Sequence, residues 1–165
     1  MVRYRLSILL LFGICLIAFL GCAEQTGATV SQTQAPPPRP GMARVWFFRP
    51  QLTPQFGAVT AFSPVIYMNG APIADIPAGT TFYRDFAPGT YRFTVQALGL
   101  PTSQATTLQL APGTQDYLDV DWIPSWTQGF PEADFSFAPN TFGILSSSPQ
   151  VAHAYIPTLA YLGER

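Results

Sequence analysis

Residues 65–76 read Val-Ile-Tyr-Met-Asn-Gly-Ala-Pro-Ile-Ala-Asp-Ile, and this stretch is the strongest fold signal in the chain. Two runs that favour extended backbone flank Asn69-Gly70, the pair preferred in a two-residue type I′ hairpin turn, where both residues need positive φ. We therefore expect a β-hairpin made of 65–68 and 71–76. Pro72 cannot donate a hydrogen bond to a neighbouring strand, so it places the second strand at a sheet edge.

Short apolar runs and tight turns continue on both sides of this hairpin. Turns containing Pro, Ala, Gly and Thr recur at 77–80, 87–90 and 111–114, where Gly supplies the positive φ that a tight turn needs. The pattern predicts further strands over 44–49, 81–86, 91–98, 105–110, 115–122 and 141–147. Ser148-Pro149 is typical of a helix start and predicts a short C-terminal helix from Pro149 to about Tyr155. The sequence thus predicts an all-β fold, a single antiparallel β-sandwich of about seven or eight short strands.

Alternation along two of these strands assigns their faces, because successive side chains of a strand point to opposite sides. The side chains expected to face the core are Tyr91, Phe93, Val95 and Ala97 on one strand and Leu118, Val120 and Trp122 on another. Those expected to face away are Arg92, Thr94, Gln96, Tyr117, Asp119 and Asp121.

The N-terminal residues have the pattern of an export signal. Arg3 and Arg5 precede a 15-residue run, 6–20, that is apolar except for Ser7. A membrane-spanning helix needs about 20 such residues, so the run fits the hydrophobic region of a signal peptide. Leu20-Gly21-Cys22-Ala23 follows it.

The segment 18–23 resembles the lipobox of bacterial lipoproteins, in which the signal is removed before a Cys that carries diacylglycerol. The resemblance implies a signal peptide over 1–21 and lipidation of Cys22, with several acyl chains holding the protein on a membrane. Ala23 implies, by the same resemblance, a bacterial outer membrane with the protein facing the periplasm. The alternative is an uncleaved signal anchor in which Cys22 is incidental.

Composition limits what the exported part can do. Removing 21 residues from the 165 leaves 144, one domain's worth, with a polar, Pro-rich tether over 22–42 and a sandwich over 43–165. There is no Lys, and the six Arg that remain face nine acids, which argues against nucleic-acid binding. Cys15 leaves with the signal and Cys22 is expected to be acylated, so no disulfide or Cys-based metal site is expected, and no cofactor.

Several blocks of the domain resemble a family that itself has no established activity. They are 43–50, Ala-Arg-Val-Trp-Phe-Phe-Arg-Pro; 65–73, which contains the Asn-Gly turn; Phe82-Tyr83; and 87–91, Ala-Pro-Gly-Thr-Tyr. They are similar to an uncharacterised family of small bacterial lipoproteins with a PEGA-like β-sandwich domain. The resemblance covers about 43–122 and implies a surface β-domain. Ala71 stands where that family often has Lys.

The residues that could support chemistry have simpler interpretations. His153 is the single His, and no Gly-x-Ser-x-Gly accompanies it, so we expect a surface or packing role. The five acids of 116–134 fit polar outward positions better than a Ca²⁺ site, which they do not resemble in spacing; they are Asp116, Asp119, Asp121, Glu132 and Asp134. The strand arginines, Arg44, Arg49, Arg84 and Arg92, are expected to pair with Asp75 or Asp85.

Aromatic residues concentrate between 122 and 137, and they leave two interpretations open. Trp122, Trp126 and Phe130 can form a patch that binds a ligand or partner, or they can close one end of the sandwich. We expect a non-catalytic binding or structural module of the cell envelope, contacting a membrane through Cys22 and an envelope protein through its surface. The alternative is a carrier or sensor of a small glycan or lipid bound at 122–137, and the third is a hydrolase.

Overall fold

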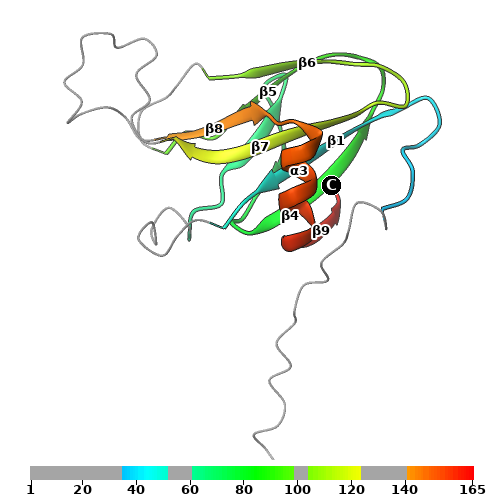
Figure 1. The fold of residues 1–165 in the computed structure, drawn as a ribbon. Coiled ribbons are helices and arrows are strands. Elements are labelled where there is room, and N and C mark those ends of the chain that lie inside the picture. The colour runs from blue at the N-terminus through cyan, green and yellow to red at the C-terminus, as the bar shows by residue number, and fades with distance from the viewer. Residues whose placement is uncertain (1–34, 52–60, 99–103, 124–140) are drawn as a thin grey trace, which may run out of the picture.

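The chain is described by a computed structural model over residues 35–51, 61–98, 104–123 and 141–165. These residues form two β-sheets packed as a sandwich, with one short helix against the outside of the larger sheet (Figure 1). The predicted all-β sandwich is confirmed. Its elements are β1 (Ala43–Arg49), β2 (Val65–Met68), β3 (Ala71–Asp75), β4 (Thr80–Phe86), β5 (Gly89–Val95), β6 (Thr106–Leu110), β7 (Gln115–Ile123), β8 (Thr141–Ser146), α3 (Pro149–Tyr155), the 3-10 turn η4 (Ile156–Thr158) and β9 (Ala160–Glu164).

The strand order differs from a purely antiparallel sandwich. One sheet has the order β8-β7-β1-β4-β9 and the other β3-β2-β5-β6. Within the larger sheet, β1 runs parallel to β7 and β4 runs parallel to β9. The prediction of an antiparallel sandwich with seven or eight strands is therefore corrected to nine described strands in one mixed and one antiparallel sheet. Strand β9 was not predicted, because its five residues show no clear alternation.

Strand β1 lies at the centre of the larger sheet and is buried along its whole length. On the inner face, Val45 and Phe47 join the core between the sheets, where Phe47 stacks on Phe82 at 4.9 Å between ring centroids. On the outer face, Trp46 and Phe48 belong to a second apolar cluster. A strand covered on both faces is expected to read as a continuous apolar run, as 45–48 does.

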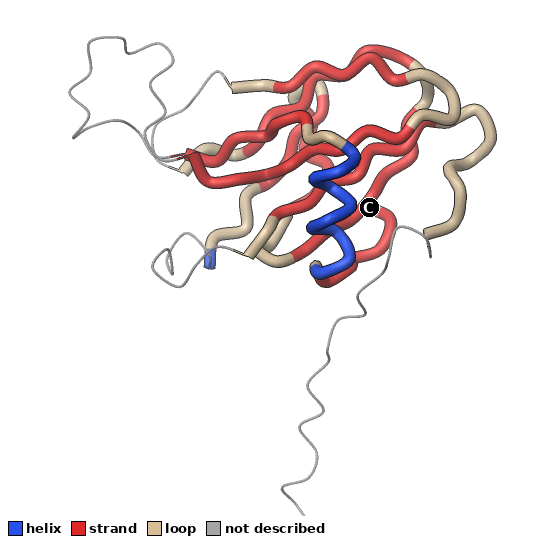
Figure 2. The backbone as a smooth tube through the Cα atoms, viewed as in Figure 1, coloured by secondary structure: helices blue, strands red, loops and turns tan. Residues whose placement is uncertain are grey.

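The second cluster exists because α3 and η4 cover part of the outer face (Figure 2). Ser148 caps the helix, its side chain accepting a hydrogen bond from the Val151 N–H, and Pro149 opens the first turn. This confirms the predicted start and length of the helix. Its buried residue Ala152, with Ile156 and Leu159 after it, packs toward the sheet.

This second layer corrects the predicted exposure of β7. The inward set is confirmed, since Leu118 and Val120 are in the core and Trp122 packs against it. Tyr117 points away from that core as expected, but it is buried beneath α3 instead of facing solvent. Among the described residues, no helix has the length and apolar composition needed to span a membrane.

The predicted hairpin around Asn69-Gly70 is present. Asn69 and Gly70 both have positive φ, at 50° and 85°, and they join β2 to β3. Pro72 lies in β3, which is an edge strand of its sheet as predicted. The Asn69 side chain also links the turn to β5, since its Oδ1 accepts a hydrogen bond from the Arg92 N–H at 2.9 Å.

Replacing Gly70 with Ala tests this turn. We expect a loss of about 1 kcal/mol in the free energy of unfolding, because a Cβ disfavours the left-handed backbone conformation. Urea unfolding measures it, with Gly70→Asn as the matched control, since Asn tolerates positive φ better. Equal stability of the Ala and Asn variants would contradict the turn assignment.

Candidate functional site

The predicted aromatic site is only partly within the described residues. Trp122 lies near the end of β7, half-buried, and its ring meets Phe142 of β8 edge-on at 5.2 Å. Phe62 stacks on Phe142, with the two ring centroids 5.7 Å apart. Trp126 and Phe130 lie outside the described residues. Trp122 thus packs on the core at one end of the sandwich.

Arg49 lies beneath this aromatic group. Its side chain is 1% exposed, and its guanidinium carbon is 4.6 Å from the centroid of the Phe142 ring. Nη1 donates hydrogen bonds to the carbonyls of Phe62 at 2.6 Å and Ile76 at 3.1 Å. Burial lowers the pKa of Arg49, and the charge of Asp121 opposes that shift. The expected pairing of Arg49 with Asp75 or Asp85 is wrong, because β1 directs this side chain between the sheets.

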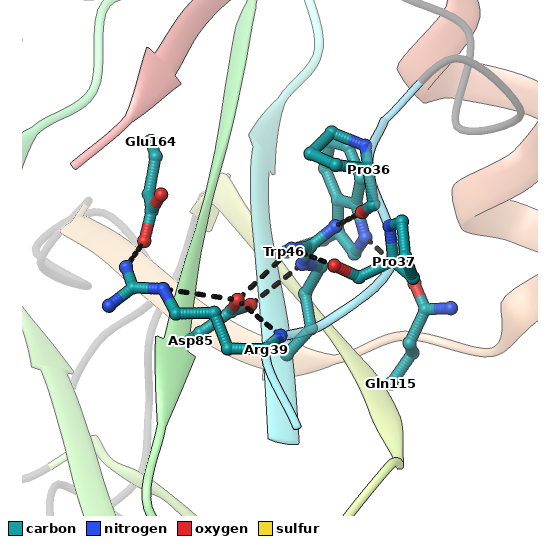
Figure 3. Close-up of polar contacts among 8 residues, drawn as sticks. Pro36, Pro37, Arg39, Trp46, Asp85, Gln115 and Glu164 are labelled. Atoms are coloured by element: carbon teal, nitrogen blue, oxygen red, sulfur yellow. Dashed lines mark hydrogen bonds and ion pairs between the residues drawn. The ribbon is translucent and has the colours of Figure 1, made fainter. Parts of the chain in front are cut away.

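A second group of polar residues lies on the outer face, where β1 pairs with β4 (Figure 3). Arg44 and Asp85 face each other across the two strands, and both side chains are almost completely buried. Arg44 Nε donates to Asp85 Oδ1 at 2.8 Å and Nη2 donates to Oδ2 at 3.1 Å. The guanidinium also lies 3.7 Å from the centroid of the Tyr83 ring. The predicted Arg44–Asp85 pair is confirmed.

The residues that precede β1 bind to this pair. The carbonyls of Pro36 and Pro37 accept hydrogen bonds from Arg44. The Arg39 N–H donates to Asp85 Oδ2 at 3.1 Å, and the Arg39 guanidinium forms an ion pair with Glu164 of β9. We call residues 35–39 the proline strap. The last part of the predicted tether is thus held against the sandwich.

The electrostatics of Asp85 follow from these contacts. Burial by itself raises the pKa of a carboxyl group. Here the hydrogen bonds from Arg44 and from the Arg39 N–H, together with both positive charges, outweigh burial and hold the pKa of Asp85 below its usual value. Asp85 is therefore an ionised, fully partnered carboxylate at neutral pH.

Asp119 is in the opposite situation. It lies on the outer face of β7, next to Phe48 on one side and Leu145 on the other. Its Oδ1 is buried and has no hydrogen-bond partner within the described part of the chain. Burial, with a smaller contribution from Asp121, raises the pKa of Asp119 to about 7. Asp119 thus points away from the core as predicted, but its carboxyl group is poorly solvated.

The other predicted acids do not gather around Asp119. Asp121 Oδ1 accepts from the N–H of Trp122 at 2.7 Å, and Asp116 lies at the other end of β7 beside Thr114. Glu132 and Asp134 lie outside the described residues. Within the described residues, no three His, Cys, Asp or Glu side chains are grouped so that they could hold a metal ion.

His153 is exposed on α3, and its Nε2 lies 3.3 Å from the Tyr117 hydroxyl. The two rings meet edge-on with centroids 5.7 Å apart. This contact ties the helix to the strand beneath it, which is the packing role that the sequence suggested. Cys22 lies outside the described residues.

Sequence reasoning missed the proline strap. The prolines at 36–38 indicated a spacer, and the only available sign of docking was the buried Arg44–Asp85 pair itself, whose members are 41 positions apart. No protein-family model matches the chain, and no curated protein is significantly similar to it. The function therefore has to be inferred from the residues of the chain itself.

Proposed function

We propose that this chain is a lipid-anchored protein of the bacterial cell envelope and acts as a non-catalytic binding or structural module. In this proposal the signal is removed before Cys22, which carries the lipid, and the sandwich faces the periplasm from the outer membrane. The proposal includes kinship with the small bacterial lipoproteins that carry a PEGA-like domain.

The observation that carries the proposal is the docking of the proline strap on the Arg44–Asp85 pair. The strap begins 13 residues after Cys22, so an anchor at Cys22 pulls on the sandwich at the outer face of its larger sheet, where β1 pairs with β4. A docked strap keeps the same surface of the domain turned away from its attachment point. A fixed orientation is useful to a module that binds a partner at the membrane.

The contacts of the charged residues support a structural over a catalytic role. Arg44 and Asp85 bind each other and the strap, and Arg49 binds backbone carbonyls. Groups that are held in this way are neither free to move protons nor open to a substrate.

The anchor is tested first by metabolic labelling with an alkyne palmitate analogue. We expect the wild type and Cys15→Ala to be labelled and Cys22→Ala to lose the label. Cys15 is the matched control, because it is the other Cys of the chain and is removed with the signal. Labelling of Cys22→Ala at the wild-type level would contradict the proposal.

The binding role is tested by in-cell crosslinking of the tagged protein followed by mass spectrometry. We expect a discrete envelope protein to be captured by the wild type and by Cys15→Ala, but not by Cys22→Ala. Capture of the same protein by all three variants would show that the anchor does not direct binding.

A small-ligand carrier is the second candidate, favoured by the partly buried Trp122 beside Phe142 and Phe62 at one end of the sandwich. A glycan and lipid screen with wild type and Trp122→Ala separates the candidates. A ligand bound by the wild type and lost in Trp122→Ala would favour the carrier.

A further inference from the structure

The backbone groups of the proline strap are complementary in hydrogen bonding to the side chains of the Arg44–Asp85 pair. Three consecutive prolines, 36–38, offer carbonyl oxygens but no N–H groups. Arg44 supplies donors only, and it meets two of those carbonyls, on Pro36 and Pro37. The first N–H after the prolines belongs to Arg39, and the acceptor Asp85 binds it at 3.1 Å.

Charge and aromatic surface add to this match. The Arg39 guanidinium lies 3.8 Å from Asp85 Oδ2 and pairs with Glu164, so the site presents two carboxylates to a basic residue that follows the prolines. Ala35 packs against the outer cluster that contains Trp46 and Tyr83. Proteins that recognise proline-rich segments commonly combine an aromatic surface with donors to the segment's carbonyls.

The site does not depend on the strap for its own structure. Arg44 and Asp85 come from the paired strands β1 and β4 and bind each other through two hydrogen bonds that involve no strap atom. By contrast, Pro36 and Pro37 are exposed and the Arg39 side chain is 60% exposed. Lifting the strap therefore breaks a few partly exposed bonds and leaves a preformed site.

The link between strap and sandwich can serve as a hinge. Residues 40–42 connect the strap to β1, and Gly41 in that link has a φ of 76° with open space around its Cα. A hinge of this kind absorbs a change of direction at a few residues. Exchange of a segment between two identical molecules recreates the same contacts and is a low-cost route to a dimer.

We propose that the Arg44–Asp85 pair is a binding site for an extended proline-rich segment, and that it accepts the strap of a second copy of this chain in place of its own. The exchange couples two molecules side by side on one membrane. The lipid anchor proposed above favours it by concentrating copies in a plane. The recognition itself is independent of Cys22.

The binding site is tested with the full chain extracted in detergent and a labelled peptide that copies residues 34–41, Gln-Ala-Pro-Pro-Pro-Arg-Pro-Gly. In the strap variant, Pro36, Pro37 and Pro38 are each replaced by Gly, which removes the fixed backbone that favours docking. We expect fluorescence anisotropy to show at least tenfold tighter binding to the strap variant than to the wild type. The control peptide, with Gly in place of the three prolines, should bind neither.

Two outcomes of this experiment would contradict the proposed binding site. Equal affinity of the labelled peptide for both proteins, or equal affinity of both peptides for the strap variant, would show that the pair does not recognise proline-rich backbone. The peptide comparison holds the protein constant, so it stays decisive if a substitution changes stability.

The second copy is tested by co-expressing two differently tagged chains and recovering one from detergent extracts. We expect the strap variant to recover several times more wild-type chain than a second strap variant, and the peptide to release it. Equal recovery of the wild-type chain and of the second strap variant would contradict the proposed exchange. Recovery of the wild-type chain that the peptide does not reduce would also contradict it. Palmitate labelling of the same cells shows separately whether the anchor is present.

Discussion

Replacing Arg44 with Ala is expected to lower the free energy of unfolding by about 3 kcal/mol, because it removes the buried partner of Asp85 and leaves the carboxylate with only the exposed Arg39 to compensate its charge. The Asp85 side chain is 1% exposed, so water cannot replace the two lost hydrogen bonds. The Tyr83 ring also loses the guanidinium stacked on it. Urea unfolding at pH 7 measures the effect.

Two comparisons separate the charge from the loss of packing. Arg92 lies exposed on β5, and Arg92→Ala should change stability by less than about 0.5 kcal/mol. The double variant Arg44→Met with Asp85→Leu replaces the pair by apolar side chains, and it should lose less than Arg44→Ala alone. If the double variant is less stable than Arg44→Ala, the uncompensated charge is not the cause.

The stability lost in Arg44→Ala is expected to depend on pH in one direction. The pKa of Asp85 is lower in the folded protein than its ordinary value of 3.8. A lowered carboxyl pKa contributes stability that is present above the unfolded value and is lost as the pH falls through the folded value. The difference between wild type and Arg44→Ala should therefore narrow below about pH 4.

Replacing Asp119 with Asn is expected to stabilise the protein at pH 8 by about 1–3 kcal/mol. Its pKa is raised to about 7 in the folded protein, mainly because its carboxyl group is buried and Oδ1 has no described partner. Above pH 7 the fold must therefore hold an ionised group in a poorly solvated place. Asn keeps the shape without the charge.

The sign again follows from linkage. A carboxyl whose folded pKa is raised binds more protons in the folded state between its unfolded value, 3.8, and about 7. The contribution of Asp119 to the free energy of unfolding of the wild type therefore falls as the pH rises from its unfolded pKa to its folded pKa. The advantage of Asp119→Asn should vanish near pH 4 and be complete at pH 8. Asp75→Asn, at an exposed surface ion pair, is the control for exchanging Asp for Asn at a solvated position.

Thermal unfolding of both variants across pH 4–8 measures this difference. An advantage of Asp119→Asn that is the same at both ends of the range would show that Asp119 is ordinarily solvated. Asp121→Asn should lower the pKa of Asp119, because Asp121 is the neighbouring charge that contributes to the shift.

Local chemistry was enough to predict most of the strands. The Asn69-Gly70 turn, the Ser148 cap and the alternation around Phe93 each act within a few residues, so a sequence displays them directly. The parallel pairings of β1 with β7 and of β4 with β9 are different, because neither partner carries a sign of the other. Their existence depends on the packing of the whole molecule.

The candidate sites also combine features that the local sequence reveals with features that depend on distant packing. Alternation correctly separated the two faces of β7, but a period of two cannot reveal that α3 covers the second face. The exposure of Tyr117 was misjudged for that reason, although its face was predicted correctly. The proline strap was taken for part of a spacer, because what holds it is a pair of side chains from β1 and β4.

The parallel pairing of β9 with β4 has a consequence for how the chain acquires its structure. Thr80 pairs with Ala160, which is 80 positions further along, and Arg44 of the central strand pairs with Gln115. Contacts so distant along the chain form slowly, since long loops must close before they reward the chain. In the export proposed above, a chain threaded across the membrane from its N-terminal end would deliver β1 and β4 well before their parallel partners. The larger sheet would then stay incomplete during passage, which would keep the chain in the loose state that a narrow translocation channel requires.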